Sequence, residues 1–77
     1  MGSDDVLIGK VQAKATGADI HDVNCMIAYY NSCVRILKKD ISDKQRDFYS
    51  KRFGIATIIL SKYLEGESIK DLTKKYW

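Results

Sequence analysis

Residues 19–39 read DIHDVNCMIAYYNSCVRILKK and carry the clearest structural signal in the chain. Apolar side chains recur in this stretch every three or four residues, which is the period of an amphipathic α-helix. Asp19 and Asp22 have the spacing of a capping box at its start, and Arg35, Lys38 and Lys39 suit the negative end of the helix dipole. The stretch predicts a helix of about five turns. Its apolar stripe comprises Val23, Met26, Ile27, Tyr30, Cys33, Val34 and Leu37.

A second long helix is predicted over residues 43–64. Ser42 and Gln45 form a capping-box pair before it, and apolar residues again repeat at spacings of four and three. Gly54 precedes a run of strand-like composition, residues 55–59, so we expect it to admit a neighbouring helix or to mark a kink. The breadth of the apolar face predicts a helix buried on two sides at the centre of the fold. That face comprises Phe48, Tyr49, Phe53, Ile55, Ala56, Ile59, Leu60 and Tyr63.

Two shorter helices are predicted at the ends of the chain. Ser3 is a candidate cap for a helix over residues 4–16 that ends at Gly17, although residues 6–9 equally suit a short strand or a loose arm. Gly66 ends the long helix, and Ser68 with Asp71 begins a short one. Because 77 residues suffice for only one core, the sequence predicts a single all-α domain. The expected fold is a small four-helix bundle with two long central helices and two short outer ones.

The positive charge is concentrated in the middle of the chain. Residues 34–62 carry eight basic and three acidic side chains, a net charge of +5, whereas the whole chain carries +3. Basic side chains around a tight turn are able to contact successive phosphates of a nucleic acid, and the alternative is a solvated surface that complements a helix dipole. The candidate nucleic-acid-binding residues are Arg35, Lys38, Lys39, Lys44, Arg46, Lys51 and Arg52.

The sequence offers little for catalysis or cofactors. The one histidine, His21, lies one helical turn before Cys25, and two ligands fall short of the four in a structural zinc site. We expect no enzyme activity, no metal, no cofactor and no small-molecule substrate. Cys25 and Cys33 would lie about 12 Å apart along one helix, so we expect reduced thiols and a cytoplasmic location. No apolar run approaches the roughly 20 residues that span a membrane.

Two other classes of function remain open. Residues 63–76 have the cap spacing of part of a helix-turn-helix regulator, with Lys70, Lys74 and Lys75 on the last helix. Tyr29 lies beside the apolar stripe of its helix, where an exposed aromatic ring suits a protein partner. Most of the other aromatic residues fall on apolar stripes and are expected in the core.

A basic bundle of about four short helices resembles the HRDC domain, the accessory module of RecQ-type helicases and RNase D. The resemblance covers the chain in outline and implies weak binding of single-stranded or branched DNA in recombination or repair, beside a helicase. The absence of proline and of a glycine-rich hairpin departs from that family's pattern. The composition, rich in Lys, Asp, Tyr and Ile, also resembles that of small proteins encoded beside a recombination helicase in T4-like phages.

Overall fold

The computed structural model describes residues 3–77 and the side chains from Val6 onward. It contains four helices and, within those residues, no strand: α1 (Ser3–Lys14), α2 (Asp19–Leu37), α3 (Asp43–Leu64) and α4 (Ile69–Tyr76). The predicted all-α bundle with two long and two short helices is confirmed. The first helix ends at Lys14, two residues earlier than expected. The predicted capping role of Ser3 depends on a side chain outside the described set.

The start of α3 follows the prediction and the start of α2 does not. The Gln45 backbone N–H donates to Ser42 Oγ, and the Ser42 N–H donates to Gln45 Oε1, both at 3.2 Å. At α2 the cap residue is Ala18, with no side-chain hydrogen bond, so the predicted Asp19 cap is wrong. The Asp19 carboxylate instead accepts a 3.0 Å hydrogen bond from the Tyr63 hydroxyl of α3. That contact holds the beginning of α2 against the end of α3.

The glycines that were expected to end helices have the predicted conformation. Gly17 has φ +59° and Gly66 has φ +108°, values that L-residues rarely adopt. Gly54 is different, because α3 runs unbroken through it and a Cβ placed there would meet nothing within 4 Å. The expected close approach of another helix at Gly54 is therefore wrong.

One core joins all four helices. α1 contributes Val11, and α4 contributes Ile69 and Leu72. Lys14 Nζ donates to the Tyr63 carbonyl oxygen and lies 4.3 Å from the centroid of the Tyr63 ring, which holds the end of α1 against α3. The central helices supply the rest of the core: Val23, Met26, Ile27, Tyr30, Ala56, Ile59, Leu60 and Tyr63.

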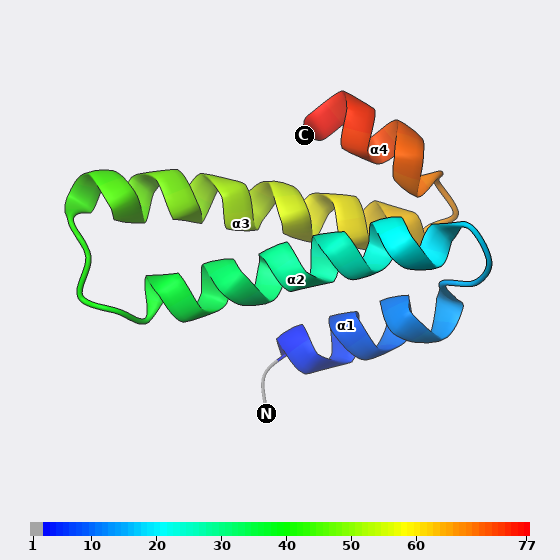
Figure 1. Ribbon diagram of the computed structural model, residues 1–77, viewed down its shortest axis with the longest axis horizontal. Coiled ribbons are helices and arrows are strands. Elements are labelled where there is room, and N and C mark those ends of the chain that lie inside the picture. Colours follow the sequence, from blue (N-terminus) through cyan, green and yellow to red (C-terminus); the bar gives the residue numbers. More distant parts are fainter. Residues whose placement is uncertain (1–2) are drawn as a thin grey trace.

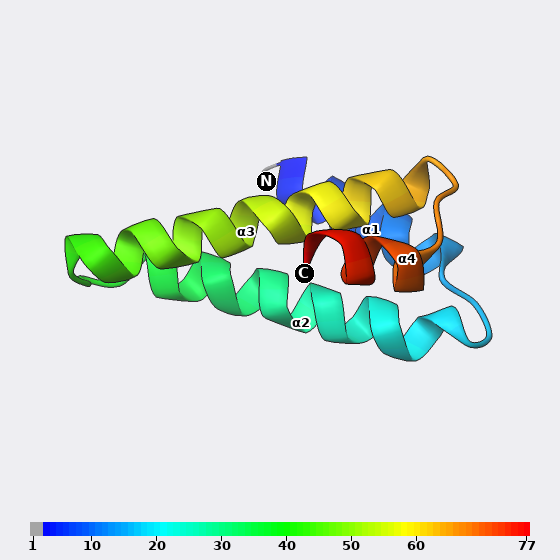
Figure 2. The ribbon, with the colours of Figure 1, turned by 90° about the horizontal axis from the view of Figure 1, so that it is seen from above.

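The two outer helices cover only one end of the central pair. In Figure 1, α1 and α4 lie on opposite sides of the α2–α3 pair, and the hairpin between α2 and α3 extends beyond both of them. Figure 2 shows the same hairpin projecting past the end of α4. None of residues 34–55 is fully buried. We call this segment the arm.

None of the described helices combines the length and the apolar character that a bilayer span requires.

Candidate nucleic-acid interface

All seven predicted nucleic-acid-binding residues lie on the arm. Arg52 is half-buried, and the side chains of the other six are exposed. Among the described residues, Lys51 is the one member of this set in a salt bridge, 3.2 Å from Asp47. Both partners are more than two-thirds exposed, so this pair contributes little to stability and exchanges readily with another anion. The arm thus presents several cations whose charge is not neutralised within the chain.

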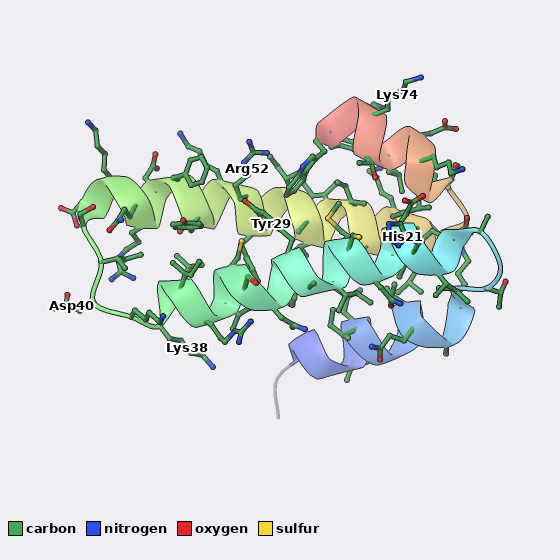
Figure 3. All side chains as sticks on the ribbon, in the orientation of Figure 1. His21, Tyr29, Lys38, Asp40, Arg52 and Lys74 are labelled. Carbon is green, nitrogen blue, oxygen red and sulfur yellow. The ribbon has the colours of Figure 1, made fainter. Side chains whose placement is uncertain are left out.

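Three of these cations share one edge of the arm, on α3. Lys44, Lys51 and Arg52 recur at helical spacing, which places them on the same side of the helix. Figure 3 shows Arg52 on this edge, with Lys38 on the opposite edge of the molecule. We call the first the α3 edge.

The remaining cations lie on or near α2. Arg35 and Lys39 line one shallow hollow together with Ile36. Arg46 extends from α3 across the hairpin and donates from its guanidinium to the Leu37 carbonyl oxygen at 3.3 Å, at the end of α2. This contact satisfies a carbonyl that the helix itself leaves without a partner. The predicted cluster is therefore divided between two edges instead of forming one patch.

The backbone N–H groups at the start of α3 add less than expected. Those of Gln45 and Arg46 are already bonded to the Ser42 side chain and the Ser42 carbonyl. Asp43 in the same turn is acidic. The start of α3 therefore offers an anion fewer free backbone donors than the sequence predicts.

Two aromatic rings are exposed beside the α3 edge. Phe48 is 49% exposed and Trp77 is 42% exposed. The Arg52 guanidinium carbon lies 5.6 Å from the centroid of the Phe48 ring and 4.9 Å from that of Trp77. Sequence reasoning placed Phe48 in the core because its helical spacing is correct, but no outer helix reaches far enough along the arm to cover it.

Tyr29 is not the exposed ring that the sequence suggested. It is half-buried, and Trp77 packs edge-on against it with the ring centroids 4.5 Å apart. Burial raises the pKa of Tyr29 and that of the Cys33 thiol, and the positive charge of Arg52 opposes both shifts. The charge of Arg52 therefore acts on groups of α2 as well as on the surface.

The other candidate residues form no recognisable reaction centre. His21 Nε2 lies 3.8 Å from the Cys25 sulfur, and the Cys25 side chain is exposed. No group of three or more metal-ligating side chains occurs in the described part of the chain. On α4, Lys70 and Lys74 line an open hollow with Asp22 and Asp71. Two of the lysines that the helix-turn-helix prediction singled out therefore lie beside acidic side chains.

Comparison with known proteins gives no match to any family model, any curated protein or any solved structure. The HRDC resemblance and the phage resemblance stay predictions. The fold and the site define a small all-α domain that carries a projecting basic arm.

Proposed function

We propose that this chain is a non-enzymatic module that binds single-stranded or branched DNA weakly through its arm, as an accessory to a DNA-processing protein such as a helicase. The observation that supports the proposal is the placement of seven cations on a segment that contributes no fully buried side chain to the core. A surface with that much positive charge attracts a polyanion, and the hydrogen bonds and packing of the core do not depend on it.

The division into two edges sets the strength of binding. A single strand that follows one edge meets about three cations, so log K should fall with log salt with a slope of about −2. Electrostatic binding of this kind has a dissociation constant of about 10⁻⁴ to 10⁻⁶ M at physiological salt. Such binding is too weak for a regulator that acts alone, and it suits an accessory module held close to DNA by a partner. The HRDC resemblance supports the same context.

The test is a titration of the whole chain into fluorescently labelled single-stranded, duplex and forked DNA, followed by anisotropy at low and moderate salt. The arm variant is Lys38→Glu/Lys39→Glu/Lys44→Glu, which should bind at least about tenfold more weakly than the native chain. The matched control is Lys10→Glu/Lys70→Glu/Lys75→Glu, which makes the same change in net charge at exposed positions of α1 and α4. Equal affinity of the two variants would exclude the arm as the binding surface.

A protein-interaction module is the second candidate function. The observation in its favour is a hollow of about 250 Å³ between α2 and α4, lined by Met26, Tyr29, Thr73 and Trp77 and bordered by Asp22. Aromatic residues and methionine are enriched where proteins bind one another. A partner that uses this hollow should lose affinity for an Asp22→Lys variant and keep it for the arm variant. The reverse result would rule the hollow out.

A further inference from the structure

We infer that Phe48, Arg52 and Trp77 form a base-stacking site, so that the arm recognises unpaired nucleobases and not only phosphates. The inference rests on the proposed function and adds a ligand class to one edge of the arm. It assigns a role to two exposed rings that the charge pattern alone leaves unexplained.

The geometry of the three side chains carries the inference. The Arg52 guanidinium carbon lies 5.6 Å from the Phe48 centroid and 4.9 Å from the Trp77 centroid. Both rings keep more than two-fifths of their surface open to solvent, although large aromatic side chains are usually well buried. One guanidinium group is therefore within cation–π range of two exposed rings.

This arrangement has the dimensions of a short single strand. The two distances place the ring centroids at most about 10.5 Å apart, so the site spans no more than about three stacked nucleotides at 3.4 Å each. Bases stack on aromatic rings and on guanidinium planes alike, and the contact tolerates any base because every base has a π-face. The rings are also held in place, since Tyr49 packs edge-on against Phe48 and Tyr29 packs edge-on against Trp77.

The charges around the rings match a nucleic-acid strand more closely than an apolar partner. Lys44 precedes Phe48 by one helical turn and Lys51 follows it by nearly one, so the two ammonium groups belong to residues about 10 Å apart along the helix. Asp47 is the acidic neighbour of this set, and Lys51 is its salt-bridge partner. Cations on both sides of stacking rings are the combination that single-stranded DNA requires.

Trp77 makes the inference directly measurable, because it is the one tryptophan in the chain. The probe is unlabelled oligothymidylate of about 15 nucleotides, within the range bound by one small single-strand-binding domain. A base that stacks on Trp77 should quench its fluorescence in step with binding. A strand of the same length with abasic sugars carries the same phosphates, and it should bind at least about fivefold more weakly.

A pair of variants separates the ring from the general effect of an exposed apolar side chain. Phe48→Ala should weaken oligothymidylate binding at least about fivefold, from the low end of measured stacking contributions, and leave binding of the abasic strand unchanged. Ile58→Ala is the control, since Ile58 is similarly exposed on α3 at 42% and lies about 15 Å from Phe48 along the helix axis. Ile58→Ala should bind both strands as the native chain does.

The outcomes distinguish this inference from the proposed function. Equal binding of the thymidylate and abasic strands, with Trp77 fluorescence unchanged, would overturn the stacking site and leave the arm as a phosphate-binding surface. Binding of neither strand at low salt would overturn both the inference and the proposed function. Quenching by thymidylate that Phe48→Ala weakens and Ile58→Ala does not would establish the site.

Discussion

The substitution Gly54→Ala should stabilise the protein. Gly54 lies in the interior of α3, where glycine is about 0.8–1.0 kcal/mol less favourable than alanine because it loses more backbone freedom on folding. A Cβ at this position would meet no atom within 4 Å, so no steric cost offsets the gain. The free energy of unfolding should therefore rise by about 1 kcal/mol. In a domain of this size that corresponds to a rise in Tm of about 4–8 °C.

The assay is thermal and urea unfolding, followed by far-ultraviolet circular dichroism. Gly66→Ala is the comparison, because Gly66 has φ +108° and an L-residue there is strained. That variant should lose about 1–2 kcal/mol, although the same atoms are added as at Gly54. A Gly54→Ala variant that is no more stable than the native chain would refute the reasoning. It would mean that α3 bends at Gly54 or that a neighbour packs more closely there than the structure shows.

Three further predictions concern contacts that hold the helices together. Tyr63→Phe should lower the free energy of unfolding in urea by about 1.5–3 kcal/mol, because it removes the hydroxyl that donates to Asp19 and leaves the buried ring in place. An unchanged free energy would show that this hydrogen bond is not made in solution. Ser42→Ala should cost about 1 kcal/mol by the same measurement, because it removes half of the capping box of α3, whereas Ser50→Ala, at an exposed position in the same helix, should cost little. The free energy of unfolding should fall as pH rises above the ordinary thiol pKa, because burial raises the pKa of Cys33 and the thiol therefore loses its proton first in the unfolded chain. Unfolding curves for Cys33→Ala should show a smaller fall over that pH range. An identical fall would show that Cys33 is not the group responsible.

The parts of the fold that follow from local chemistry could be predicted from the sequence. Ser42 and Gln45 are three residues apart, and their reciprocal hydrogen bonds require nothing beyond one turn of helix. The left-handed conformation of Gly17 is likewise a property of a single residue. Asp19 was mispredicted because its carboxylate has a better partner in Tyr63, 44 residues along the chain, which local spacing does not reveal.

The exposure of Phe48 shows a second limit of sequence reasoning. Periodicity identifies the side of a helix that faces a neighbour, but it does not show how far along the helix that neighbour extends. At 1.5 Å per residue, α3 with 22 residues is about 33 Å long, whereas α4 with eight residues is about 12 Å long. The α4 helix is therefore too short to cover the first half of α3. The exposure of the Phe48 ring was missed for this reason.

Binding and folding should respond to different residues in this protein. Every fully buried side chain of the core lies outside the arm, whereas all seven candidate cations lie on it. Charge substitutions at exposed sites usually change stability by less than about 0.5 kcal/mol, so variants of Lys38, Lys39 and Lys44 should unfold like the native chain. Any loss of DNA binding by these variants then reports on the interface itself. If they unfold at clearly lower urea concentrations, the arm contributes to stability and its charges cannot be assigned to binding alone.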